Sequence, residues 1–112
     1  MNWSVDWAWW QADTREIELS DRLQSFFTAQ GLTNYSSRFT LDGRSQGHDH
    51  ATGLVAMNAT ASLVATHPRA KPFAEALWDA PIPTGRYRYY DGMLYLLAML
   101  HGSGEFQIWS PQ

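Results

Sequence analysis

Residues 51–66 read ATGLVAMNATASLVAT, and this stretch decides the fold. Ala, Gly, Ser and Thr fill most positions between the larger Leu, Val and Met residues, and His67-Pro68 follows, where the proline disfavours further helix. Small side chains allow another helix to approach closely. We therefore expect a tightly packed inner helix over residues 51–66.

Further helical patterns lie on both sides of this stretch. The apolar spacing predicts helices over residues 1–10, 13–30, 73–78 and 89–101. Asp13 and Glu16 have the spacing of a capping box at the start of the second of these helices. Trp3, Trp7 and Trp10 share one face of the first helix, and we expect them to form a contact between helices. The alternative is a platform for a sugar.

The helices over 51–66 and 89–101 are expected to be neighbours, because small residues on the first admit the bulky face of the second. The whole pattern predicts an all-α structure. The residues expected in this helix packing are Leu54, Val55, Leu63, Tyr95, Leu96 and Met99.

Residues 32–49, LTNYSSRFTLDGRSQGHD, lose the helical period. They predict a long loop, or a short hairpin in which an extended piece over 38–41 precedes the Asp42-Gly43 turn. A connection of this length is usually functional. We therefore expect the loop to border a site.

Length and composition narrow the function classes. The chain has 112 residues, no cysteine and a formal charge of −3, so we expect one domain without disulfides or thiol chemistry. Its scattered basic residues do not favour nucleic acid as a partner. No apolar run has the length of a membrane span, and this segment carries no signal-peptide pattern, which leaves the compartment open between cytoplasm and exterior.

His48-Asp49-His50 is the densest group of possible metal ligands. His67 and His101 lie at predicted helix ends, where a histidine is a routine structural device, so the spacing does not favour a metal site. Hydrogen bonding to a polyhydroxylated ligand suits His48 and His50 better, since neutral imidazole offers a donor and an acceptor. Anchoring of the following helix is an equal alternative. We expect no metal and no cofactor.

Residues 86–92, RYRYYDG, form the densest polar and aromatic cluster. Tyrosine rings suit sugars, whose faces are apolar and whose edges carry hydroxyls. The alternative places one or two of these tyrosines in the core, with Asp91 capping the last helix. No two carboxylates have a spacing that marks an acid–base pair for hydrolysis.

Several blocks together resemble the C-terminal part of a family 8 glycoside hydrolase, most closely the branch that cuts xylan and xylo-oligosaccharides. The blocks are TLDG (40–43), TGLVAMNA (52–59) and YRYYDGMLYLLAMLH (87–101). The resemblance covers almost the whole chain. It implies the C-terminal portion of an α/α barrel of six helical hairpins, in which residues 1–112 form a single partial domain, and it implies hydrolysis of β-1,4 linkages with inversion.

The resemblance also implies roles for individual residues. Tyr87 and Tyr90 match contacts to the sugar beside the scissile bond. The loop with His48 and His50 is similar to one that closes the product side of the cleft in the reducing-end xylose-releasing branch. The family's two catalytic carboxylates have no counterpart in this segment, and Asp6 is not the base. We therefore expect the segment alone to be inactive.

Two function classes remain open at this point. The first is a part of an inverting hydrolase of xylan or xylo-oligosaccharides that contributes substrate-binding residues. Its further partner would be the missing half of the barrel or, failing that, a second copy of the chain. The second is a non-catalytic helical module that binds a saccharide or a protein.

Overall fold

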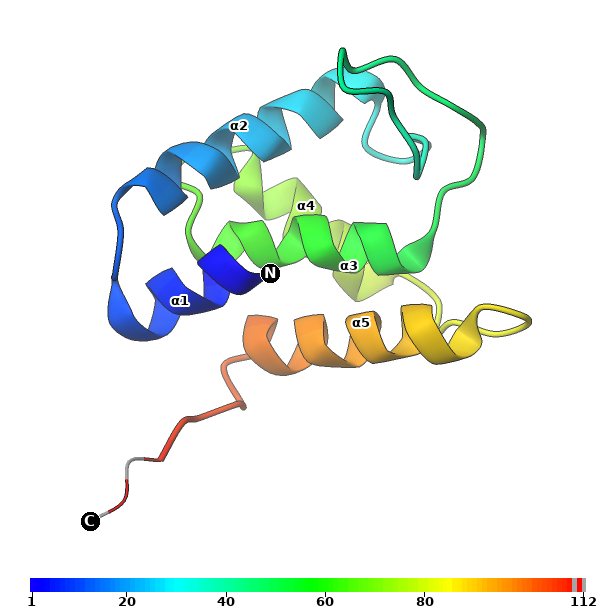
Figure 1. The fold of residues 1–112 in the computed structure, drawn as a ribbon. Coiled ribbons are helices and arrows are strands. Elements are labelled where there is room, and N and C mark those ends of the chain that lie inside the picture. The colour runs from blue at the N-terminus through cyan, green and yellow to red at the C-terminus, as the bar shows by residue number, and fades with distance from the viewer. Residues whose placement is uncertain (110, 112) are drawn as a thin grey trace.

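The structure of the protein is a computed structural model, which describes residues 1–109 and 111. Within this range the chain forms α1 (Asn2–Trp10), α2 (Arg15–Gln30), α3 (Thr52–Thr60), the 3₁₀ helix η1 (Ala61–Leu63), α4 (Ala70–Asp79) and α5 (Arg88–Gly102) (Figure 1). The described residues contain no strand, and an isolated antiparallel bridge joins Phe39 to Ser45. The prediction of an all-α fold with a hairpin-like loop near 32–49 is confirmed.

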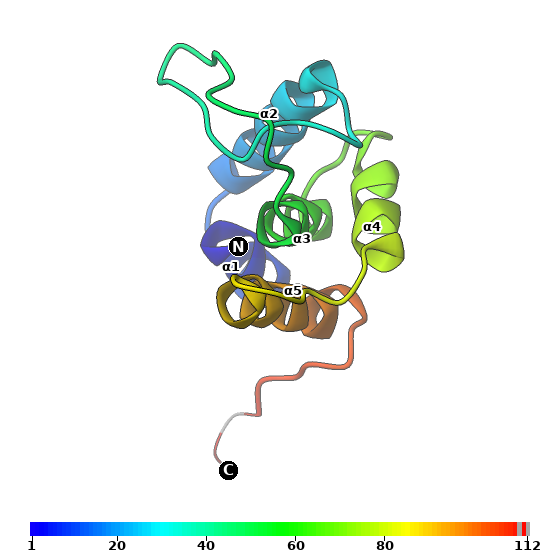
Figure 2. The ribbon, with the colours of Figure 1, turned by 90° about the vertical axis from the view of Figure 1, so that its right-hand side faces the viewer.

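Helix α3 lies at the centre of the bundle, with α1, α2, α4 and α5 around it (Figure 2). Its most extensive contact is with α5, as predicted. Small residues make this contact close, since Ala56, Ala59 and Ala98 are buried in one cluster with Tyr95 and Met99 packed against it. The inner-helix interpretation of residues 51–66 is therefore confirmed for α3, which covers its first nine helical residues, Thr52–Thr60.

Two details of this packing differ from the prediction. Leu96 is half exposed, because it lies two residues, or about 200° of helix, from the buried Ala98. Helix α3 is shorter than expected and tightens into η1 after Thr60. The Thr60 hydroxyl donates to the carbonyl oxygen of Met57 at 2.7 Å, which competes with the regular helical bond at that position.

A second cluster, largely aromatic, holds the long loop against α2. Phe27, Tyr35 and Phe73 are buried together with Val55. The ring centroids of Phe27 and Tyr35 lie 4.7 Å apart. The loop is thus anchored at Tyr35, close to where it leaves α2, by burial of apolar area against the core.

Buried polar groups connect α2 to the C-terminal end of the α3–η1 segment. The Gln24 amide nitrogen donates to the carbonyl oxygen of Asn58 at 3.2 Å and to the Ser62 hydroxyl at 2.8 Å. Ser62 in turn donates to the carbonyl oxygen of Ala70 at the start of α4, at 2.8 Å. Such bonds fix the relative positions of three helices, because a buried polar group without a partner is costly.

The contact between α1 and α2 is also polar. The Trp3 indole nitrogen donates to the Ser20 hydroxyl at 3.0 Å. Glu16 is buried beside Asp6, and its Oε2 atom has no hydrogen-bond partner. Burial raises the pKa of the Glu16 carboxyl, and the Asp6 carboxylate raises it further. The tryptophan prediction fails at Trp10, which is 61% exposed.

The predicted capping box at the start of α2 is wrong. The helix begins at Arg15 after Thr14, and no side chain caps it. The Asp13 carboxylate instead binds the side chain and the backbone N–H of Arg15. This contact lowers the pKa of Asp13 to about 2.

Among the described residues, no helix combines the length and the apolar character needed to cross a bilayer.

Replacing Glu16 by Gln is expected to raise the melting temperature at pH 7. A carboxyl whose pKa is raised on folding destabilises the folded state once the pH rises through its ordinary value of about 4.3. The neutral amide avoids this cost. Thermal unfolding at several pH values checks the prediction, and the difference between the two proteins should vanish below about pH 4.

Glu18→Gln is the matched control. Glu18 is exposed and pairs with Arg22 at 3.4 Å on the helix surface. Such pairs contribute about 0.3–0.5 kcal/mol, so this change should leave the melting temperature nearly unaltered. A melting temperature of Glu16→Gln at or below that of the original protein at pH 7 would contradict the account of the α1–α2 contact.

The isolated chain is expected to self-associate through an apolar outer face of α5. Tyr89, Met93 and Leu96 are exposed on successive turns of this helix, and contiguous apolar surface favours association. Light scattering should therefore give a mass above the 12.8 kDa of one chain. Leu96→Ser should lower this mass, whereas Leu41→Ser, in the exposed loop, should not. A monodisperse species of 12.8 kDa would refute the prediction.

Candidate functional site

An open hollow lies between the end of the long loop and the first turns of α3 and α5. Its volume is about 570 Å³. It brings together three segments of the sequence, and its lining residues are Ser37, Arg38, Asp49, His50, Ala51, Tyr87 and Asp91. Of the four predicted site residues, His50 and Tyr87 therefore share one hollow.

The orientation of His50 is set by Tyr35. The His50 Nδ1 atom lies 2.9 Å from the carbonyl oxygen of Tyr35, and the two rings meet edge to face with centroids 4.5 Å apart. Because a carbonyl oxygen can only accept, Nδ1 carries the hydrogen. The Nε2 atom of the neutral ring is then an acceptor, which a hydroxyl group of a ligand can use.

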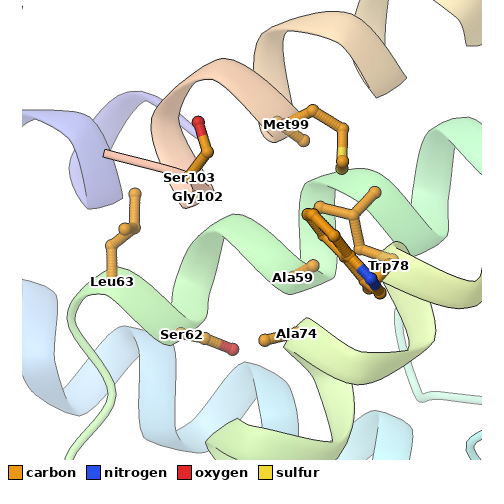
Figure 3. Close-up of a pocket in the computed structure, with 10 residues that line it drawn as sticks. Ala59, Ser62, Leu63, Ala74, Trp78, Met99, Gly102 and Ser103 are labelled. Carbon is orange, nitrogen blue, oxygen red and sulfur yellow. The ribbon is translucent and has the colours of Figure 1, made fainter. Parts of the chain in front are cut away.

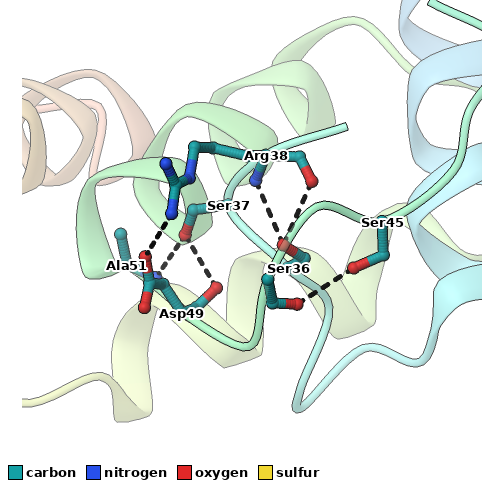
Figure 4. Close-up of polar contacts among 7 residues, drawn as sticks. Ser36, Ser37, Arg38, Ser45, Asp49 and Ala51 are labelled. Atoms are coloured by element: carbon teal, nitrogen blue, oxygen red, sulfur yellow. Dashed lines mark hydrogen bonds and ion pairs between the residues drawn. The ribbon is translucent and has the colours of Figure 1, made fainter. Parts of the chain in front are cut away.

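The base of the loop is closed by Ser37 (Figure 4). Its backbone N–H and its hydroxyl both donate to the carbonyl oxygen of Asp49, at 2.7 and 2.9 Å. The same hydroxyl accepts from the backbone N–H of Ala51 at 2.8 Å. The Arg38 guanidinium lies 3.6 Å from the Asp49 carboxylate. These contacts hold Asp49 and His50 at the start of α3.

Tyr87 lies opposite the loop, directly before α5, and it is 65% exposed. The Arg86 guanidinium lies 5.4 Å from the centre of its ring. A largely exposed ring at the edge of a hollow offers an apolar face and a hydroxyl group to a ligand.

The other two predicted residues do not line this hollow. Tyr90 is 67% exposed on the first turn of α5, and His48 is exposed in the loop. The alternative that places tyrosines of this cluster in the core does not apply to Tyr87, Tyr89 or Tyr90, which are all exposed. Asp91 does not cap α5 either, since Tyr87 occupies that position.

The hollow offers several groups that can form hydrogen bonds with a ligand. Its carboxylates belong to Asp49, which faces Arg38, and to Asp91. No group of three or more His, Asp or Glu side chains suited to a metal ion occurs among residues 1–109 and 111.

Two of the other cavities border α3, and both suit a sugar less well. One of about 210 Å³ lies between α3, η1, α4 and α5, and its walls are mainly Ala, Leu, Met and Trp side chains (Figure 3). A second open hollow, of about 540 Å³, lies on the other side of His50 against α4. It contains none of the tyrosines of the RYRYYDG cluster.

Sequence reasoning missed several residues of the site. The sequence pattern places Ser37 and Arg38 only in the loop, and it does not connect Tyr35 with His50. The cluster YSSR (35–38) and the cluster HDH (48–50) flank the predicted turn at Asp42-Gly43 on its two sides. Their meeting at the base of a hairpin-like loop is the signal that could have identified them.

No protein-family model matches the chain. Among curated proteins, it is 36% identical over 96% of its length to the reducing-end xylose-releasing exo-oligoxylanase of Paenibacillus barcinonensis. It is 37% identical over 99% of its length to the enzyme of the same name from Halalkalibacterium halodurans. In both cases the chain spans 29% of the relative's length.

Solved structures extend the likeness to the fold. The crystal structure of a GH8 xylobiose complex from Teredinibacter turnerae superimposes with a TM-score of 0.93 and 47% identity. The match covers 98% of this chain and 28% of that one. The fold is accordingly a portion of the α/α barrel that the sequence resemblance implied.

Removal of the Ser37 hydroxyl should loosen the base of the loop. Ser37→Ala leaves the backbone N–H of Ala51 without its acceptor, and one such bond contributes about 1 kcal/mol. Amide hydrogen exchange at Ala51 should become several-fold faster.

Ser45→Ala is the control, because the Ser45 hydroxyl donates to the carbonyl oxygen of Gly47 near the tip of the loop. It should leave exchange at Ala51 unchanged. Equal exchange rates at Ala51 in the original protein and in Ser37→Ala would show that the hydroxyl does not hold the loop.

Proposed function

Because the chain is related along nearly its whole length to a part of the family 8 glycoside hydrolases, we propose that it supplies substrate-binding residues to a hydrolase of xylan or xylo-oligosaccharides. The observation that carries the proposal is the hollow shared by His50 and Tyr87. A ring face, a free imidazole acceptor and polar groups around an open hollow together suit a pentose, which has apolar faces and hydroxyl-bearing edges.

Each side chain has a definite part in this proposal. Tyr87 packs its exposed ring against a sugar face. His50 accepts a hydrogen bond from a sugar hydroxyl through Nε2, and its bond to Tyr35 keeps that atom free. Tyr90 and His48 remain predicted contacts for further sugar units of a longer chain. The part of the loop that carries His48 and His50 would determine which end of the product is released.

The names of the related proteins indicate which class of ligand to expect. One related structure is a GH8 xylobiose complex, and two curated relatives are named reducing-end xylose-releasing exo-oligoxylanases. The chain spans less than a third of each. We propose that hydrolysis requires carboxyl groups beyond this chain, since inversion needs an acid and a base roughly 6.5–9.5 Å apart across the bond. The partner that completes the site would be the remainder of a family 8 barrel.

The isolated chain is expected to bind xylotriose without hydrolysing it. Saturation-transfer NMR, which observes the sugar and tolerates an associated protein, measures the binding. The anomeric signals of the sugar, followed over hours in the same tube, report hydrolysis. His50→Ala and Tyr87→Ala should each weaken binding about fivefold or more, in line with the loss of roughly one hydrogen bond or ring contact.

His67→Ala and Tyr89→Ala are the matched controls. His67 is an exposed histidine in the connection between η1 and α4. Tyr89 is 81% exposed and does not line the hollow. Both should bind as the original chain does. Absence of any saturation transfer to xylotriose would refute the binding role. Release of xylose by the isolated chain would refute the need for carboxyl groups elsewhere.

A further inference from the structure

Within the part of the chain that the structure describes, the Asp91 carboxylate has no ion-pair or capping role that would explain its position in the fold. Asp91 lies in the first turn of α5, is half buried, and lines the hollow. It does not cap α5, and its carboxylate forms no ion pair with any residue that the structure describes. A half-buried carboxylate without a cation beside it keeps its acceptor positions free for hydrogen bonds.

Gly53 shows how closely the Asp91 carboxylate is seated. Gly53 is buried in the first turn of α3, opposite Asp91. A Cβ atom at this position would lie 2.6 Å from Oδ1 of Asp91 and 3.0 Å from Cδ1 of Leu94. Real Cβ atoms do not approach another atom to 2.6 Å, so any larger residue at position 53 would displace the carboxylate or separate the helices. The absence of a side chain here sets the place of Asp91.

We propose that Asp91 is a sugar-binding residue of this hollow, whose carboxylate accepts hydrogen bonds from hydroxyl groups of the same xylose unit that contacts Tyr87. The inference rests on the proposed function and deepens it. Asp91 follows Tyr87 by four residues, so the two side chains lie on the same side of α5. The Asp91 backbone N–H also donates to the carbonyl oxygen of Tyr87 at 3.1 Å, which keeps this spacing regular.

The chemistry of the hollow supports this assignment. A carboxylate accepts from two adjacent hydroxyl groups at once, and hydrogen bonds to charged groups are stronger than neutral ones. The other carboxylate of the hollow, Asp49, already faces Arg38 at 3.6 Å. Asp91 is therefore the acceptor of the hollow that a neutral sugar can use without displacing an ion pair.

Asp91→Asn tests the inference because the amide has the same shape and fits beside Gly53. Its carboxamide oxygen still accepts, but without the charge, and its nitrogen presents donors in place of an acceptor. Binding of xylotriose by saturation-transfer NMR should weaken about tenfold relative to the original chain. The melting temperature should change by little, since the side chain keeps its volume. Asp79→Asn is the matched control, as Asp79 lies near the C-terminal end of α4 beside the second hollow.

Gly53→Ala gives an independent test through the position of the carboxylate. It should weaken binding even though residue 53 does not line the hollow. The double variant Gly53→Ala with Asp91→Asn should then bind no more weakly than Asp91→Asn alone, because the displaced group has already lost its role. A Gly53→Ala variant that binds xylotriose as tightly as the original chain would contradict the inference, because its displaced carboxylate could not then hold the sugar.

The outcomes separate the two proposals. Xylotriose binding by the original chain that His50→Ala weakens and Asp91→Asn leaves unchanged would overturn the role of Asp91 and keep the proposed function. An equal loss in Asp79→Asn would show a general effect of charge and would also overturn it. No binding by the original chain would overturn both.

Discussion

The close approach of α3 to α5 is the constraint on which the rest of the structure depends. Gly53, Ala56 and Ala59 lie three residues apart along α3, and α5 packs against them. Had these positions carried larger side chains, the helices would separate, and the start of α5 would move away from the end of the loop. The hollow exists because the first turns of both helices are held side by side.

A second cluster determines the other wall of the hollow. Tyr35 is buried against Phe27, and its carbonyl oxygen binds the imidazole of His50. Tyr35 thus connects the aromatic cluster to His50 by this hydrogen bond and by the edge-to-face contact of the two rings. The Ser37 hydroxyl binds the carbonyl oxygen of Asp49 and the backbone N–H of Ala51 and so closes the base of the loop. Residues 36–49 therefore form a projecting, hairpin-like unit on a fixed base. Rigid placement of this kind reduces the ordering cost of binding a ligand.

Much of the fold could be predicted from the sequence because its signals are local. The spacing of small and large residues over 51–66 and 89–101 specified both helices and their contact, and Asp42-Gly43 specified the turn of the loop. The errors also have local causes. The apolar character of Leu96 predicts that it packs between the helices, but the helical period turns it away from Ala98 and leaves it half exposed.

The site was less accessible to sequence reasoning because it depends on which segments meet. Histidines and tyrosines could be selected as residue types that suit sugars, but nothing in their spacing distinguished His50 from His48 or Tyr87 from Tyr90. The distinction comes from the Tyr35 carbonyl and from the first turn of α5, which are tertiary features. The contact between the carboxyl groups of Asp6 and Glu16 could not be predicted either, because the two residues lie on different helices, α1 and α2.

The most direct measurement of the central claim is a crystal structure of the chain with xylotriose. The account predicts a sugar ring against the face of Tyr87, with a hydroxyl oxygen about 2.7–3.2 Å from Nε2 of His50. A sugar bound instead in the apolar cavity under α5, or on an exposed tryptophan with the hollow empty, would contradict it.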